Sequence, residues 1–244
     1  MKTIIFTMLM LLPMLASEEN VEIDGIYYYL ITKGEVAEVN GHPDGYSGSV
    51  VIPESITYEG AEYSVTSLGA AAFASCPYLT SVTIPNSVKS IGWTAFYGCS
   101  GLTNVNIPNS VTGIGGYAFA GCSGLTSVTI GSGITGIGEK AFESCPELSD
   151  VYCLAESVPS TFSNAFEYSY IEYATLHVPR KSIDAYKTAE PWKIFKNVVA
   201  IDNSTTKKCA VPTISYTNGK LTFTCDTEGA ECVTTISDTD IKCK

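Results

Sequence analysis

Cysteines are the residues of this chain whose type and spacing could most readily do chemistry. Nine occur among 244 residues, and cysteines can form disulfides, hold zinc or act as nucleophiles. Four of them recur at one constant spacing, at Cys76, Cys99, Cys122 and Cys145. Each follows a phenylalanine by three residues, in a position that suits a small apolar group. Side chains stacked in parallel are poorly oriented for a disulfide, so we expect these four to be buried free thiols.

The cysteines near the C-terminus are better candidates for disulfide pairing. They are Cys209, Cys225, Cys232 and Cys243, and their spacings fit no zinc finger. The chain also lacks a Cys-x-x-Cys pair. We therefore expect no metal ion at the cysteines.

Catalytic patterns are absent as well. The two histidines are His42, in a Gly-His-Pro-Asp-Gly turn, and His177. Neither belongs to a Ser-His-Asp arrangement or a His-Glu-x-x-His motif. The glycine-rich run 113–116 repeats elsewhere in the chain, so we assign its glycines to turns and not to a phosphate loop. The sequence predicts no enzyme and no cofactor.

The charge of the chain narrows its partners. The formal net charge is −11, which argues against nucleic acid or an anionic membrane as a partner. Residues 17–62 hold ten carboxylates against a single cation, Lys33. No loop there alternates carboxylates as a calcium loop does, so we interpret the segment as a solvated end-piece.

A single period, the one kept by the four cysteines, organises the middle of the chain. The stretch Leu79–Ile84 has apolar residues with a period of two at Val82 and Ile84, which predicts a short strand, and Pro85 ends its hydrogen bonding. Each unit then makes one coil, and stacked coils pair their strands about 4.8 Å apart. No unit can bury its apolar face alone, so several must stack. The residues that keep the period include Phe73, Phe96, Phe119 and Phe142, Leu79, Leu102, Leu125 and Leu148, Val82, Val105, Val128 and Val151, and Ile84, Ile107, Ile130 and Cys153.

The units at both ends of this region are irregular. An insertion after Ile52 contains Tyr58–Ala61, which we expect to form a hairpin turn. Asn164-Ala165-Phe166 comes one residue late, and residues 176–179 look like a last strand.

The repeat "LTSVTIPNSVKSIGWTAFYGCSG" resembles the bacterial-surface (BspA-like) leucine-rich repeats of Bacteroides type, over about residues 50–180. The resemblance implies an α+β repeat solenoid: a right-handed leucine-rich-repeat coil of 23-residue units with a parallel β-sheet face. A β-rich N-terminal cap, a helical C-terminal cap and a short β-hairpin tail complete the expected fold. Characterised relatives act as adhesins toward host extracellular proteins or other cells, which implies a surface-exposed binding protein.

The chain then divides into six parts. Lys2, an apolar run over 4–15 and a small residue at the exit predict a secretory signal peptide, and the run is too short to span a bilayer. We therefore expect a secreted or cell-surface protein with no membrane span. The parts are a signal peptide (1–16), an N-terminal cap (17–48), the solenoid (49–180), a C-terminal cap (181–201), a linker (202–208) and a partial β-sandwich-like module (209–244).

The C-terminal cap is expected to close the last coil. Residues 181–187 fit a short helix with Ile183 and Tyr186 on one face. Trp192, Ile194 and Phe195 would then cover the exposed end of the solenoid.

A binding surface is expected on the outward side of the sheet. We propose that this polar strip binds a host or cell-surface protein, or a glycan; the alternative is a face that only keeps the protein soluble. Tyr152 is the most ligand-like residue as an exposed aromatic, and Trp93 and Tyr97 form a weaker second patch. The expected function is adhesin-like protein binding, with a glycan-binding accessory protein or a structural spacer as alternatives. The strip comprises Ser81, Thr83, Asn104, Asn106, Ser127, Thr129, Asp150 and Tyr152, with Thr175 and His177 as an extension.

Overall fold

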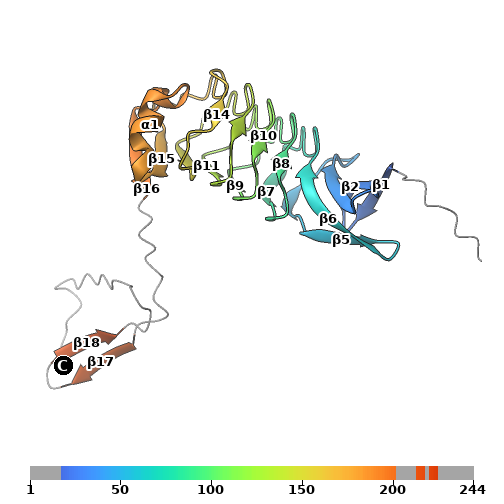
Figure 1. Cartoon of the computed structure of the whole chain (residues 1–244), viewed down its shortest axis with the longest axis horizontal. Coiled ribbons are helices and arrows are strands. Elements are labelled where there is room, and N and C mark those ends of the chain that lie inside the picture. The colour runs from blue at the N-terminus through green and yellow to red at the C-terminus, as the bar shows by residue number, and fades with distance from the viewer. Residues whose placement is uncertain (1–17, 202–212, 218–219, 225–244) are drawn as a thin grey trace, which may run out of the picture. The chain divides into compact units, whose positions relative to one another are not determined.

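The computed structural model describes residues 18–201, 213–217 and 220–224 (Figure 1). Two compact units divide the chain at Ile201, and each is described by itself. The expected signal peptide (1–16), the linker (202–208) and the pairing of the four C-terminal cysteines lie outside the described residues. Within the described ranges, no helix is long and apolar enough to cross a membrane.

The second unit contains the expected β-hairpin. Strand β17 (Thr213–Thr217) pairs antiparallel with β18 (Lys220–Thr224), and Thr217 lies opposite Lys220. Two residues therefore connect the strands, which is the loop length that favours a tight hairpin.

The first unit begins with an antiparallel meander. Strands β1 (Glu18–Ile23), β2 (Ile26–Ile31) and β3 (Val36–Asn40) pair in order. β3 then pairs in parallel with β6 (Ala61–Leu68). Alternate residues of β2 and β3 are buried, so this meander covers the open end of the solenoid core.

The insertion before the regular coils forms the expected hairpin. β5 (Ser55–Tyr58) pairs antiparallel with β6, and Tyr58 lies opposite Ala61. The connecting residues Glu59 and Gly60 both have positive φ, which is the backbone of a type I′ turn.

The parallel sheet face predicted from the repeat is present. Equivalent positions on successive strands lie opposite one another, as Val105, Val128 and Val151 do. β4 and β7 form a separate parallel pair that precedes the five-stranded sheet. The strands are β4 (Gly48–Val51), β7 (Leu79–Thr83), β9 (Asn104–Ile107), β11 (Ser127–Ile130), β13 (Asp150–Cys153), β15 (Thr175–Pro179) and β16 (Asn197–Ile201).

A second parallel sheet, which the sequence did not indicate, runs along another side of the coils. Its strands have only two residues each, too short for alternation to be recognised in the sequence. They extend the sheet of β3 and β6, so the N-terminal meander and this ladder form one continuous sheet (Figure 1). The strands are β8 (Ser90–Ile91), β10 (Gly113–Ile114), β12 (Gly136–Ile137) and β14 (Ser160–Thr161).

Phenylalanine rings form the spine of the core. The rings at positions 73, 96, 119 and 142 stack nearly parallel, with centroids 4.9 to 5.1 Å apart. Phe166 continues the stack at 5.3 Å despite its late position in the sequence. Tyr46 closes the spine at one end and Trp192 at the other.

The repeated cysteines are buried free thiols, as expected, and they also donate hydrogen bonds. The thiol of Cys99 bonds to the carbonyl of Phe73, and that of Cys145 to the carbonyl of Phe119. In the last coil the hydroxyl of Ser169 takes this role toward Phe142. The position therefore requires a small buried donor and not only a small apolar group.

Gly115 serves close packing between coils, which corrects its assignment to a turn, whereas Gly116 lies in a turn as expected. A Cβ atom on Gly115 would lie 2.6 Å from the carbonyl carbon of Gly92, and one on Gly92 would lie 2.7 Å from that of Gly69. Their φ angles lie outside the left-handed region. Glycine is needed because the backbones of consecutive coils approach too closely here for any side chain.

The C-terminal cap is helical and buries an aromatic cluster. It consists of a 3-10 turn (Arg180–Ser182), helix α1 (Ile183–Thr188) and a second 3-10 turn (Trp192–Ile194). Tyr186, Trp192 and Phe195 are buried beneath it, as expected. Ile194 is less buried than the other two residues expected to cover the last coil, with 41% of its surface exposed.

Candidate binding surface

The predicted strip consists of two rows of side chains on the outer face of the parallel sheet. Strand register sets each row, because equivalent residues of neighbouring strands lie opposite one another. One row contains Asn104, Ser127, Asp150, Thr175 and Asn197. The other contains Asn106, Thr129, Tyr152, His177 and Val199. Ser81 and Thr83 hold equivalent places on β7, opposite Ser49 and Val51 of β4.

The strip is polar and differs along its length. Thr83, Asn104 and Asn106 are exposed, while the other predicted residues are half-buried. The hydroxyl of Ser81 donates to the hydroxyl of Ser49 over 2.7 Å. At the β7 end of the strip, part of the hydrogen-bonding capacity is therefore used within the protein. The two asparagines on β9 present accessible amides, as does the exposed Asn197 on β16.

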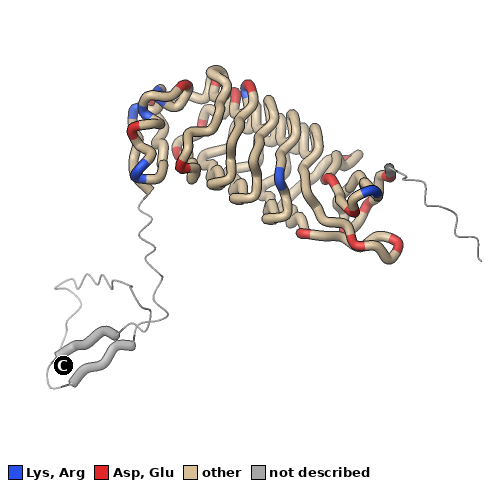
Figure 2. The backbone as a smooth tube through the Cα atoms, viewed as in Figure 1, with Lys and Arg blue, Asp and Glu red and all other residues tan. Residues whose placement is uncertain are grey.

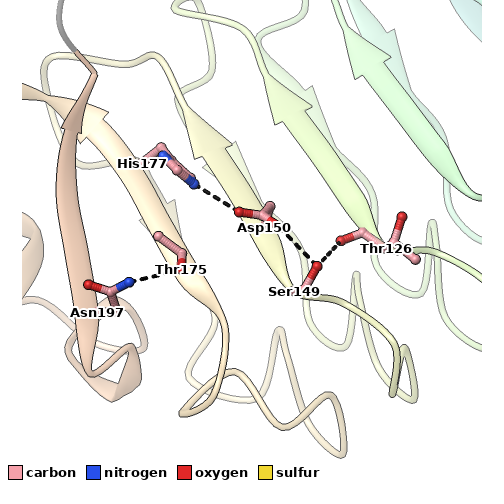
Figure 3. Close-up of polar contacts among 6 residues, drawn as sticks. All are labelled: Thr126, Ser149, Asp150, Thr175, His177 and Asn197. Atoms are coloured by element: carbon pink, nitrogen blue, oxygen red, sulfur yellow. Dashed lines mark hydrogen bonds and ion pairs between the residues drawn. The ribbon is translucent and has the colours of Figure 1, made fainter. Parts of the chain in front are cut away.

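The expected extension by Thr175 and His177 is confirmed by the register of β13 and β15. Thr175 lies opposite Asp150, and His177 lies opposite Tyr152. Asn197 on β16 donates from its Nδ2 to the hydroxyl of Thr175 over 3.0 Å. The strip thus continues onto the last strand of the sheet (Figure 3).

Asp150 and His177 form the ionisable part of the strip. Nε2 of His177 lies 3.0 Å from Oδ1 of Asp150, and the hydroxyl of Ser149 donates to Oδ2 over 3.0 Å (Figure 3). The hydrogen bond from His177 is the main cause that holds the pKa of Asp150 below its ordinary value, and the bond from Ser149 adds to it. This carboxylate is therefore ionised and oriented at neutral pH.

Tyr152 is less available than expected. Its ring stacks on the ring of His177, with centroids 4.0 Å apart and planes 10° from parallel. The side chain is half-buried and not a freely exposed aromatic. One face is covered by the histidine, so a partner can contact the remaining face and the hydroxyl.

Charges are sparse along the coils. Acidic and basic positions gather toward the two ends of the first unit, and most of the coils between them carry neither (Figure 2). A partner that contacts the central strip would meet hydroxyls and amides, which favour directional hydrogen bonds over charge attraction.

Other aromatic side chains are more exposed than any in the strip. Trp93 is 52% exposed and Tyr97 47%, as the second patch requires. Sequence reasoning missed Tyr168, Tyr170 and Tyr173, which follow the late Phe166. The sequence could have indicated them, because two of these tyrosines replace smaller residues of the repeat. Earlier units have serine or glycine at the position of Tyr168, and serine or proline at the position of Tyr170.

Comparison with known proteins agrees with the repeat architecture. The family described as "BspA type Leucine rich repeat region" matches residues 66–190, in six copies. No curated protein matches the chain.

Three solved structures are similar. A leucine-rich repeat protein of T. pallidum has 28% identity and a TM-score of 0.56, over 65% of this chain and 71% of that one. One from Bacteroides ovatus has 33% identity and a TM-score of 0.56, over 65% of this chain but only 40% of that one. One from Bacteroides capillosus has 30% identity and a TM-score of 0.50, over 55% of this chain and 97% of that one.

Proposed function

The chain belongs to the BspA-type leucine-rich repeat family, and we propose that it is an exported, non-catalytic binding protein of the cell surface. Its partner is a host extracellular or cell-surface protein, recognised through the polar strip of the parallel sheet. Residues 17–244 would be the mature protein after removal of the signal peptide.

One observation carries this proposal: the outward rows of the sheet are aligned strand by strand into a continuous hydrogen-bonding surface. The accessible amides of Asn104 and Asn106 lie at one part of it, and the oriented Asp150 carboxylate at another. Extended sheet faces of solenoids are a usual place for partner recognition. Tyrosine and histidine near Asp150 add an aromatic group of the kind enriched at binding hot spots.

Export and surface location support each other in this proposal. The basic start and short apolar run of the first sixteen residues are typical of a signal peptide. A binding surface of hydroxyls and amides is useful where a partner from another cell can reach it. N-terminal sequencing of the protein recovered from its native cells tests the first part, and a start at residue 17 or 18 is expected.

The binding test compares the mature chain with a triple variant. Mature protein is immobilised and presented with a panel of host matrix proteins and with whole cells. Asn104→Ala, Asn106→Ala and Tyr152→Ala together are expected to weaken binding at least tenfold, since hot-spot substitutions each cost roughly 1–2 kcal/mol or more.

A matched control carries Asn86→Ala and Tyr78→Ala, both exposed and outside the strands of the sheet. Its affinity should equal that of the wild type. Unchanged affinity of the triple variant would exclude the strip as the binding face. Specific hits on a glycan array, with no protein partner bound, would instead favour the glycan-binding alternative.

A further inference from the structure

The most exposed aromatic group of the solenoid lies beside its last regular coil. Residues 167–173, here called the tyrosine loop, contain Tyr168, Tyr170 and Tyr173, which are 65%, 57% and 82% exposed. Val128 pairs with Val151 on the next strand, but Val151 pairs with Leu176, so the coil between β13 and β15 is longer than the one before it. The added length gives this loop room that the other coils lack.

Two tyrosines of the loop have a left-handed backbone conformation, which is unfavourable for residues other than glycine. Tyr168 and Tyr170 have φ angles of +60° and +49°, in the left-handed region. Gly98 and Gly121 occupy the position of Tyr168 in the central coils. A side chain in this conformation costs about 1–2 kcal/mol relative to the ordinary helical region, whereas glycine accepts it freely. Ser75 and Ser144 hold the position of Tyr168 in two other coils with φ angles of +56° and +54°, so this backbone is a property of the coil that the tyrosines share.

Two pockets of about 450 Å³ each flank Tyr170. Pocket A lies between the tyrosine loop and the C-terminal cap, and its walls include Tyr168, Tyr170 and the exposed Ile194. Pocket B lies toward the start of β13, and its walls include Leu148, Tyr170 and Tyr173. Tyr170 is the wall that the two pockets share. Together they form a bipartite hollow with largely apolar sides, as small recognition sites usually have.

The charged residues that line this hollow are all negative. Glu167 and Glu172 line pocket A and Glu147 lines pocket B, and no lysine, arginine or histidine lines either one. Among the residues that the structure describes, Glu147 and Glu172 have no ion-pair partner. Each pocket thus offers one carboxylate without a cation.

The neighbouring coil already shows what such an arrangement holds. The ammonium group of Lys140 lies 5.7 Å from the ring centroid of Tyr117, and bonds to Glu143 over 2.7 Å and to Glu167 over 3.1 Å. Its carboxylate partners raise its pKa. On the tyrosine loop itself, Lys196 lies 5.8 Å from the ring centroid of Tyr173. Cations therefore lie over tyrosine rings at two places on this surface, and at Lys140 two carboxylates hold the cation as well.

We propose that the two pockets bind a basic peptide segment of a partner protein, with an arginine or lysine side chain against Tyr170 between Glu147 and Glu172. The aromatic walls supply apolar contact for the stem of the side chain and a π face for its charge. The two carboxylates supply the opposite charge. An uncharged sugar would also stack on tyrosine, but it would leave both carboxylates without a cation. This site adjoins the polar strip at Ser149, which lines pocket B and donates to Asp150, but no residue of the strip lines either pocket. Its failure would therefore leave the proposed function of the strip intact.

The test uses the mature chain and three defined probes in calorimetric titrations. The first is a blocked hexapeptide of alternating arginine and glycine, the second is the same peptide with citrulline in place of arginine, and the third is a neutral linear glucose hexasaccharide. The arginine peptide should bind saturably, and the other two should not. Raising salt from about 0.05 M to about 0.5 M should weaken its binding several-fold, because exposed charges become screened.

Variants separate the site from a general attraction of basic peptide to an acidic protein. Tyr170→Ala should weaken binding roughly tenfold, and Tyr170→Phe should retain it because the ring remains. Glu147→Gln with Glu172→Gln should weaken binding and flatten its salt dependence. Tyr78→Ala is the matched control, as Tyr78 is 77% exposed and lines neither pocket. Thermal unfolding of each variant checks that the fold is kept.

Four results would overturn the proposal. Equal binding of the citrulline peptide would remove the role of the charge, and binding of the hexasaccharide alone would identify a sugar site. Equal losses for Tyr170→Ala and Tyr78→Ala, or no saturable binding of the arginine peptide, would show that these pockets do not recognise a cation.

Discussion

The thiol of Cys122 donates a hydrogen bond to the carbonyl oxygen of Phe96, 3.1 Å away in the preceding coil. The same carbonyl also accepts the backbone N–H of Cys99 over 3.2 Å. The cysteine thus links one coil to the next at the centre of the core, beside the stacked phenylalanines. Its burial raises the pKa of the Cys122 thiol well above the ordinary value, so the group remains a protonated donor.

Replacing this thiol tests whether donation matters more than size. Cys122→Ala should lower the free energy of unfolding by about 1–3 kcal/mol, because it removes buried packing and one donor. Cys122→Ser should cost less, since a hydroxyl can donate as Ser169 does toward Phe142 in the last coil. Urea unfolding followed by circular dichroism measures both. If serine destabilises more than alanine, packing of the sulfur and not its hydrogen bond is the important contribution.

The buried thiols should react slowly with thiol reagents, and they should make the stability of the fold fall at alkaline pH. Burial raises the pKa of Cys99 and of Cys145 from an ordinary 9.0 to about 12. A folded-state pKa above the unfolded one gives stability that is complete below pH 9 and is lost as the pH rises toward 12. In a background with Cys209, Cys225, Cys232 and Cys243 changed to serine, a thiol reagent at pH 8 should label the native protein slowly and the urea-unfolded protein at once.

The alkaline effect has its own control. Between pH 8 and pH 10.5 the urea midpoint should fall, and it should fall less in Cys99→Ser, which has one titrating thiol fewer. Rapid labelling of the native protein would contradict the burial of the thiols. An equal fall of the urea midpoint in both proteins would show that ionisation of Cys99 does not cause the loss of stability.

Gly113 and Gly115 provide a matched pair two positions apart in one coil. Gly115→Ala would place a Cβ atom 2.6 Å from the backbone of Gly92, so it should cost about 1–3 kcal/mol through forced backbone shifts. Gly113→Ala meets nothing within 4 Å and should leave the stability nearly unchanged or slightly higher. Thermal unfolding of both variants measures the contrast. Equal effects would show that the coils can separate freely at this edge.

Asp150 should make the stability of the protein depend on pH in the acidic range. Its folded pKa lies below its unfolded value, chiefly because His177 donates to it. Its contribution to stability is therefore present above about pH 4, near the usual aspartate value, and is lost as the pH falls below that. The carboxylate side chain is 40% exposed, so solvent reduces the size of the effect.

Comparison of Asp150→Asn with the wild type isolates this carboxylate. The wild type should be more stable at pH 6, and the difference should shrink as the pH falls toward 3. Urea midpoints at several pH values measure it. A difference that stays constant over this range would mean that the Asp150–His177 contact does not depend on ionisation.

The regular part of the fold was predictable because its residues repeat. Ten or so positions on one period determine which side chains are buried, and Phe96, Cys99 and Val105 lie where the period puts them. The second sheet could not be predicted, since strands such as Ser90–Ile91 are made by cross-coil hydrogen bonding and not by a local pattern. Close packing at Gly92 was likewise hidden, because it depends on how near the next coil lies.

The candidate surfaces were predictable to different degrees. Alternation along each strand was enough to find the outward row through Asn106 and Thr129, which the register confirms. Stacking of Tyr152 on His177 was not predicted: the expected extension of the strip places the two residues side by side, but the orientation of their rings depends on packing. The tyrosine loop was missed because its side chains are exposed where the chain departs from the period, and not where it keeps the period.

Because equivalent residues are separated by a constant distance, the solenoid could be lengthened or shortened by whole units. Cys99, Cys122 and Cys145 make the same contact with the coil before them, and the phenylalanine rings keep the same spacing. A gene segment that encodes one unit could therefore be duplicated or deleted between Phe96 and Phe142 without creating any new kind of interface. Recombination between such equivalent segments would change the reach of the molecule while its two end caps remain as they are.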